Sequence, residues 1–146
     1  MRISLKRIAG GKKALGGAVE GRRDFAKLLE AVGGEPPVAQ PLFVDCEGIE
    51  LATASYQRET LGSLQGLIRG RRSNHYLVVA NASPAVREDL DVLARAGGLA
   101  FLTCALDAAG KASKACLNLL RRALQASHPS DLLSAHAATK PLDQSF

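Results

Sequence analysis

A short apolar run, Tyr76 to Ala80, constrains the fold of this chain more than any other segment. The run is continuously apolar and partly β-branched, which is typical of a strand buried on both faces of a parallel sheet. Strand-like segments alternate with segments of helical spacing as far as residue 104. This alternation predicts an α/β fold, with a twisted, mixed or mainly parallel sheet of four or five strands packed with helices.

The expected elements follow from hydrophobic period and from breaker residues. Strands are predicted at 2–6, 42–44, 76–80 and 99–104. Helices are predicted at about 21–32, 55–69 and 84–96. Gly33 and Gly34 end the first helix, and the prolines at 36 and 37 forbid its continuation. Ser83 supplies a cap for the third helix, with Pro84 at its first position.

The pattern changes after Leu106, where only helical spacing remains. We therefore divide the chain into an α/β domain at 1–106 and a helical C-terminal extension at 107–146. A helix at about 111–125 gathers basic side chains on one narrow face, and Ser130 can cap a second helix to about residue 138. The basic residues of that face include Lys111, Lys114, Arg121 and Arg122. The extension resembles half of a helix-turn-helix, and a dimerisation element is the other interpretation.

The length and the charge of the chain limit the functions that it can have. With 146 residues the chain has room for one domain and a short appendage. The formal net charge is +5, and it is concentrated at the two ends, because the central part of the sequence is slightly acidic. This bias permits contact with nucleic acid. With no Trp, four Phe and two Tyr, the chain lacks the stacking aromatics of a single-strand binding surface.

The beginning of the chain predicts a cytoplasmic protein. Five basic residues interrupt the first fifteen positions, so no apolar stretch of the kind found in secretory signals is present. The longest apolar runs are also far too short to cross a bilayer, and we expect no membrane partner.

The cysteines do not indicate a catalytic or metal site. Cys46, Cys104 and Cys116 are odd in number and widely spaced, without a CxxC pair. Cys46 and Cys104 sit in apolar strand-like runs and are predicted to be small buried hydrophobic side chains. GxxxxGK[ST] and GxGxxG are absent from the chain. We therefore expect no catalytic residues, no metal and no cofactor, and the chain is not predicted to be an enzyme.

The most informative segment runs from Val44 to Thr60. A strand ends at an acidic residue, a glycine turn and a short extended piece follow, and a small polar cluster opens a helix. This resembles the STAS domain of bacterial anti-sigma-factor antagonists. It is closer still to STAS-like domains of uncharacterised bacterial proteins, with the pattern D-F-x-G-V-E-x-I-x-x-S-F-x-D-E. The residues that match in order are Asp45, Gly48, Ile49, Glu50, Ser55, Tyr56 and Glu59.

A second match lies upstream, where the segment from Gly21 to Leu29 resembles the G-S-R-x-x-A-x-x-L helix of the same family. The resemblance covers roughly residues 1–104. It implies a regulatory protein–protein interaction module, with a kinase-like anti-sigma factor or another regulator as partner and a role in transcription regulation. The implied partner-binding residues are Asp45, Gly48, Glu50, Thr53, Ser55, Tyr56, Arg58 and Glu59.

In STAS antagonists, the serine at the position of Ser55 is phosphorylated by the partner kinase, which abolishes binding. A phosphate adds about −2 charge and three acceptors, enough to change a docking face. Antagonists usually carry Asp-Ser-Ser-Gly at this turn, whereas this chain has Thr53-Ala54-Ser55-Tyr56. The alternative is that Thr53 or Ser55 simply caps the helix, an interaction worth about 1 kcal/mol.

Other interpretations remain open at this point. Asp45, Glu47 and Glu50 form a carboxylate group that could bind a metal or act as an acid–base pair, the alternative being a solvated turn. The basic C-terminal helices could contact DNA in a transcriptional regulator. They could also join two copies of the chain in a homodimer.

Overall fold

The computed structural model describes residues 1–118 and 139–141, and it shows an α/β fold around a parallel sheet. The sheet has the order β1-β3-β5-β6-β7, and all four of its ladders are parallel. The strands are β1 (Arg2–Ser4), β3 (Gln40–Asp45), β5 (His75–Ala80), β6 (Phe101–Cys104) and β7 (Thr139–Pro141). The predicted fold class is thereby confirmed, and β5 is the central strand, buried at all six residues.

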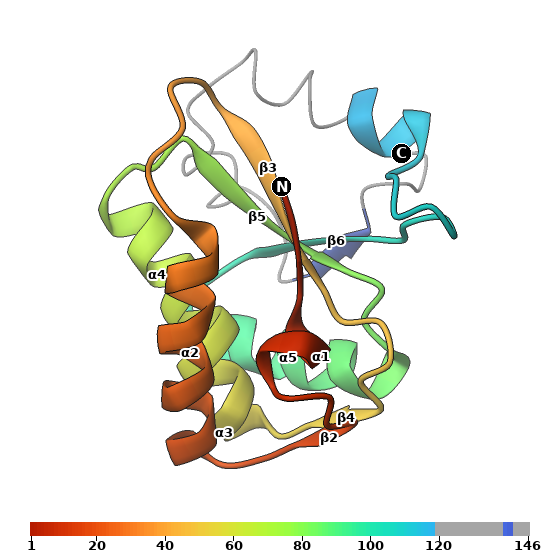
Figure 1. The fold of residues 1–146 in the computed structure, drawn as a ribbon. Helices are drawn as coiled ribbons and strands as arrows, with labels where there is room; N and C mark the ends of the chain where they lie inside the picture. Colours follow the sequence, from red (N-terminus) through yellow and green to blue (C-terminus); the bar gives the residue numbers. More distant parts are fainter. Residues whose placement is uncertain (119–138, 142–146) are drawn as a thin grey trace.

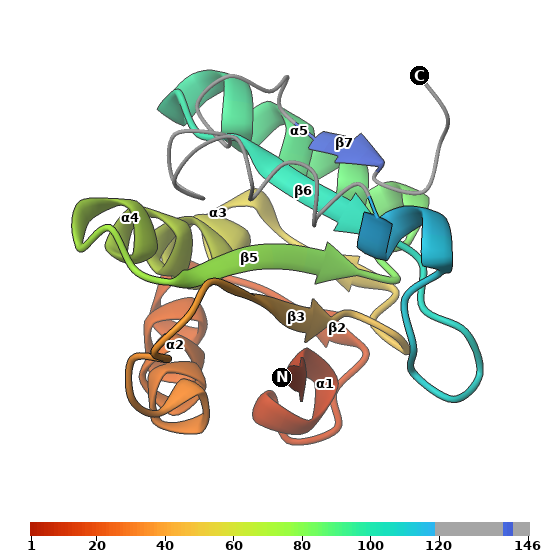
Figure 2. The same cartoon turned by 90° about the horizontal axis from the view of Figure 1, so that it is seen from above.

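Most of the helices lie on one side of this sheet (Figures 1 and 2). They are α1 (Leu5–Ile8), α2 (Ala18–Val32), α3 (Ala54–Gln57), η1 (Arg58–Gly62), α4 (Ser63–Gly70) and α5 (Pro84–Gly97). Leu28, Leu64 and Leu90, from α2, α4 and α5, join one core with Leu77 and Val79 of β5. Alternate residues of β5 thus face the helices, as the period of a strand requires.

The remaining residues of β5 face the other side of the sheet. Tyr76 and Val78 pack there with Leu102 of β6 and with Cys116, which is fully buried. Residues 114–118 are helical and lie on this second face, at the opposite side of the sheet from α2 (Figure 1). The predicted extension thus begins as a helix three residues later than expected. The division of the chain at residue 106 stays a prediction.

Part of the predicted extension falls outside the described residues. This applies to Arg121 and Arg122 and to the second helix expected from Ser130. Residues 139–141 form β7, which pairs in parallel with β6. The helical spacing after Leu106 gave no indication of this strand.

The structure adds a small feature that the sequence pattern did not predict. β2 (Ala14–Leu15) pairs in parallel with β4 (Leu51–Ala52) in a separate two-stranded sheet. Residues 9–17, where neither a strand nor a helix was predicted, therefore contain a strand, and α2 begins at Ala18 rather than at residue 21. The predicted helix at 55–69 is present as α3, the π-helical turn η1 and α4 in succession. Among the described residues, no helix has the length and apolarity needed to span a membrane.

The three cysteines are all buried, as predicted for Cys46 and Cys104. Burial, together with the neighbouring Asp45 charge, raises the pKa of the Cys46 thiol to about 12. We expect the folded protein to resist a thiol reagent such as dithiobis(nitrobenzoate), with all three thiols reacting once the protein is unfolded in guanidinium, because the reagent needs an accessible thiolate. A Val38→Cys variant, altered at a side chain that is 67% exposed, is the positive control. Rapid labelling of one equivalent in the folded wild type would contradict the burial.

Candidate functional site

The junction between β4 and α3 is organised by the hydroxyl of Thr53. Its Oγ1 atom accepts hydrogen bonds from the backbone N–H of Tyr56 at 3.3 Å and of Gly17 at 3.1 Å. Thr53 is therefore the helix cap, one of the two residues for which this role was predicted. The Ser55 Oγ atom lies 3.2 Å from Thr53 Oγ1 and is partly exposed, so its hydroxyl is not used as the cap.

Tyr56 faces the interior, which corrects its predicted place on the docking surface. Its side chain is 0% exposed, and its hydroxyl donates a 2.7 Å hydrogen bond to Oδ2 of the buried Asp24 on α2. The backbones of α2 and α3 also lie close together here, because a Cβ at Gly21 would lie 2.8 Å from the Tyr56 carbonyl oxygen. Gly21 and Tyr56, both singled out by the motifs, thus form the contact between α2 and α3.

Asp45 also has a structural role, which corrects its predicted place on the docking surface. Its side chain accepts hydrogen bonds from Asn81 Nδ2 and from the backbone N–H of Glu47, both at 3.0 Å on Oδ1. Its other oxygen lies 3.9 Å from Nε of Arg2. Asn81 holds a left-handed backbone with φ of 56° and accepts the N–H of Leu106 at 2.9 Å. Asp45 therefore ties the carboxyl end of β3 to that of β5 and to the side chain of Arg2, the first residue of β1.

The other predicted docking residues are exposed or partly exposed. Glu50 and Arg58 are exposed, and Glu59 is partly exposed with its carboxylate 3.7 Å from both Arg58 Nε and Arg22 Nη1. Gly48 has φ of 83°, a conformation that favours glycine, and lies against the Lys6 side chain. The structure brings Thr53, Ser55, Arg58 and Glu59 together on the first turns of one helix.

Two exposed apolar side chains beside this helix were missed by the sequence prediction. Val19, at the start of α2, is 74% exposed, and Leu51, on β4, is 48% exposed. Each lies two residues from one partner of the Gly17–Thr53 hydrogen bond, so both flank the junction. We use the name junction surface for Val19, Leu51, Thr53, Ser55, Arg58 and Glu59. The exposure of Leu51 follows from β4 alternation, whereas Val19 lay outside the predicted helix.

The predicted nucleic-acid residues are only partly described. Lys111 and Lys114 are exposed. Lys111 precedes the helix and lies in a turn, where its N–H donates to Asp107 Oδ1 at 2.8 Å and its carbonyl accepts the Asp107 N–H. It therefore does not share a helix face with Lys114. Because Arg121 and Arg122 lie outside the described residues, DNA binding stays a prediction, as does a homodimer.

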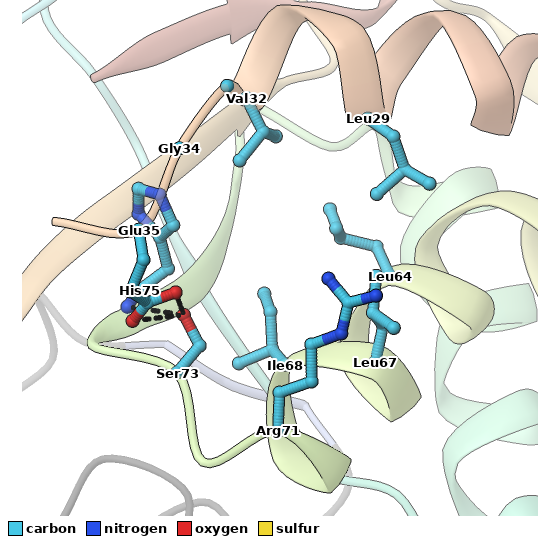
Figure 3. A pocket seen from close by; sticks show the side chains of 11 residues that line it. Leu29, Val32, Gly34, Glu35, Leu64, Leu67, Ile68, Arg71, Ser73 and His75 are labelled. Carbon is cyan, nitrogen blue, oxygen red and sulfur yellow. Dashed lines mark hydrogen bonds between the residues drawn. The ribbon is translucent and has the colours of Figure 1, made fainter.

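A cavity of about 230 Å³ lies at the other end of the strands, between α2, α4 and the start of β5 (Figure 3). Leucine, isoleucine and valine side chains of the two helices form its apolar walls, and its polar lining residues are Glu35, Arg71, Ser73 and His75. Ser73 Oγ donates to both Glu35 carboxylate oxygens, and the Asn74 N–H donates to one of them. These hydrogen bonds lower the pKa of Glu35, with the Asn74 N–H having the largest effect.

The three carboxylates of the acidic turn do not gather into one cluster with other ligands. Asp45 is engaged by Asn81, whereas Glu47 and Glu50 are exposed. In the portion of the chain covered by the structure, no group of three or more His, Cys, Asp or Glu side chains is placed to hold a metal ion.

Comparison with protein-family models, curated proteins and solved structures finds no match for this chain. The likeness to STAS-like domains therefore stays a prediction from the motif residues.

Proposed function

We propose that this chain is a regulatory protein-interaction module that binds a protein partner through the junction surface. The observation that carries the proposal is the pair of exposed apolar side chains, Val19 on α2 and Leu51 on β4, on either side of the Gly17–Thr53 contact. Exposed apolar groups rimmed by polar residues are typical of protein–protein interaction sites. Here the rim is formed by Arg22, Arg58 and Glu59. The Glu59 carboxylate lies 3.7 Å from a guanidinium nitrogen of each of the two arginines.

The base of the junction surface is rigid, which favours binding. Gln57 is buried directly beneath it, and its Nε2 donates to the carbonyl oxygens of Ala52 at 2.9 Å and Val86 at 3.3 Å. Tyr56 is held in the same way by Asp24. A surface that is already ordered loses less conformational entropy when a partner binds.

Ser55 is the proposed site of regulation. Its hydroxyl is partly exposed and lies 3.2 Å from Thr53 Oγ1, beside the apolar pair. A phosphate there would place about two negative charges on this surface, one helical turn from the Glu59 carboxylate, and would oppose an apolar contact. The resemblance to anti-sigma-factor antagonists supports this switch and a kinase-like regulator as the partner.

The proposal predicts that Leu51→Asp and Ser55→Asp each weaken partner binding at least about tenfold, since both place charge where the partner packs. The matched control is Val38→Asp, at a valine that is 67% exposed, compared with 48% for Leu51, and that precedes the opposite end of β3 (Figure 1). The partner is first captured from an extract of the native cell with the whole chain as bait. It is identified by mass spectrometry and then titrated by calorimetry against each variant.

Two results would contradict the proposal. The first is an equal affinity of the wild type and the Leu51→Asp variant for the captured protein. The second is a captured partner whose binding is weakened by Val38→Asp but not by Leu51→Asp or Ser55→Asp. Circular dichroism and urea unfolding of each variant establish that the fold is intact, because charges on exposed side chains should change stability by less than about 0.5 kcal/mol.

A further inference from the structure

The cavity between α2 and α4 has the size of a site for a small organic molecule. Its volume is about 230 Å³, compared with the roughly 150 Å³ of an engineered apolar cavity that binds benzene. Leu29 and Val32 from α2 face Leu64 and Ile68 from α4 across the open space in Figure 3. These walls fit an apolar body somewhat larger than one aromatic ring.

A buried histidine lies at one end of this cavity, beside Gly34 (Figure 3). The His75 side chain is 4% exposed, and neither of its ring nitrogens has a hydrogen-bond partner in the part of the chain that the structure describes. Its backbone N–H donates to Ser73 Oγ at 3.0 Å, which fixes the start of β5 but leaves the ring unpaired. Buried polar groups without a partner are rare in proteins and cost free energy, so a ligand that pairs with this ring would be stabilised.

The charges around the cavity indicate the sign of that ligand. Glu35 is already engaged by the Ser73 hydroxyl at 2.8 and 3.0 Å and by the Asn74 N–H. Arg71, which follows α4, extends its guanidinium toward the cavity (Figure 3), and it has no ion pair among the residues described. The positive charge is therefore the one that is free to pair with a ligand.

The end of α4 does not oppose an anion. A helix C-terminus carries partial negative charge through its last carbonyl groups. Here the carbonyl oxygens of Leu67, Ile68 and Arg69 accept the N–H groups of Arg71, Ser73 and Arg72 at 3.0 to 3.2 Å. Among the described residues, the hydrogen-bonding groups around the cavity that still lack a partner are therefore mainly donors.

We propose that this cavity binds a small monocarboxylate with an apolar body. The carboxylate accepts hydrogen bonds from the His75 imidazole and the Arg71 guanidinium, and the apolar body packs between α2 and α4. Glu35 interacts electrostatically with both His75 and Arg71, so a second negative charge on the ligand would add to the repulsion from its carboxylate, which selects for a monoanion. The site is separate from the junction surface and does not depend on the function proposed for it.

The test uses the full chain and three unbranched probes of six carbons each, which are hexanoate, hexylamine and hexanol. We expect hexanoate to bind with a Kd on the order of 0.1–1 mM by titration calorimetry. Hexylamine and hexanol should bind at least about tenfold more weakly, because they lack the charge-assisted acceptor. On binding, the ring proton signals of His75 should shift in the NMR spectrum.

The Arg71→Gln variant should weaken hexanoate at least about tenfold while leaving hexanol unchanged. Arg71 is exposed, so this variant keeps the fold, and Arg95→Gln on the exposed side of α5 is the matched control. Equal binding of the three probes would overturn the proposal, since apolar contact alone would then explain it. A preference for hexylamine, no binding of hexanoate up to about 10 mM, or unchanged binding by Arg71→Gln would overturn it as well.

Discussion

Replacing Tyr56 by phenylalanine should lower the free energy of unfolding by about 2 kcal/mol, which is a typical value for a hydrogen bond to a charged group. The hydroxyl removed by this change donates to Asp24 Oδ2 at 2.7 Å, and both side chains are 0% exposed. The other oxygen, Asp24 Oδ1, has no hydrogen-bond partner within residues 1–118 and 139–141, although Arg23 Nε lies 3.7 Å away. The variant therefore leaves a buried carboxylate without its one hydrogen bond.

The same hydrogen bond also makes the free energy of unfolding depend on pH, in a direction that follows from the pKa of Tyr56. Burial, and then the hydrogen bond to Asp24, raise the pKa of the Tyr56 phenol far above its ordinary value of about 10. The folded state thus holds the phenol proton more tightly than the unfolded state does. The stability that this adds is complete below about pH 10 and is lost as the pH rises above it. Urea unfolding at increasing pH should show a smaller loss for Tyr56→Phe than for the wild type.

Tyr76→Phe is the matched control for this prediction. Tyr76 is 4% exposed on the other face of the sheet, and none of the hydrogen bonds found among the described residues uses its hydroxyl. We expect this variant to lose less than about 0.5 kcal/mol. In the double variant Asp24→Leu/Tyr56→Phe the loss should be smaller than the sum of the single losses, because removing both partners leaves no unpaired charge. Additive losses would show that Asp24 and Tyr56 are not coupled.

The elements that the sequence predicted well are those with a long regular pattern. The unbroken apolar run of β5 indicated a central parallel strand, and β5 is buried on both faces. Ser83 and Pro84 predicted the start of α5 correctly, since Ser83 Oγ accepts the Val86 N–H at 3.3 Å. Local signals of this kind act within a few residues and need no knowledge of the rest of the fold.

The predictions that failed depended on contacts between distant segments. Asp45 was placed on a docking surface, but its partner Asn81 is 36 residues away and comes beside it only when β3 and β5 pair. β4 is the short extended piece that was predicted after the glycine turn, but β2 is two residues long, too short for a recognisable alternation, and its pairing with β4 was missed. The cavity lining likewise comes from two distant stretches of the sequence, 29–35 and 64–75, so the unpaired ring of His75 carried no signal in the sequence.

Tyr56 is an instructive case because two patterns disagreed about it. It precedes Thr60 and Leu64 by four and eight residues, a spacing that puts the three on one face of a helix, whereas the family pattern placed it among the docking residues. The structure buries all three side chains, in agreement with the spacing. A motif residue can thus be required for the contact that positions a surface without belonging to that surface. Ser55, one residue earlier in the chain, remains on the exposed side.

Gly21→Ala should destabilise the protein by about 2 kcal/mol, although alanine is ordinarily the better helix residue by about 0.5–1 kcal/mol. A Cβ at this position would lie 2.8 Å from the Tyr56 carbonyl oxygen and 2.9 Å from the Glu59 Cβ atom. The first of these is a backbone atom and cannot rotate away, so α2 must move from α3. Overpacking of this kind typically costs about 1–3 kcal/mol, which exceeds the gain in helix propensity.

Gly66→Ala provides the opposite expectation within the same chain. Gly66 is exposed in α4, and a Cβ there would have no atom within 4 Å. This variant should therefore be stabilised by about 0.5–1 kcal/mol, so the two substitutions differ in sign in urea unfolding. If Gly21→Ala were instead as stable as Gly66→Ala, α2 and α3 could not be in backbone contact. Because that contact holds Gly17 against Thr53, the junction surface would then lack the rigid base on which its proposed binding depends.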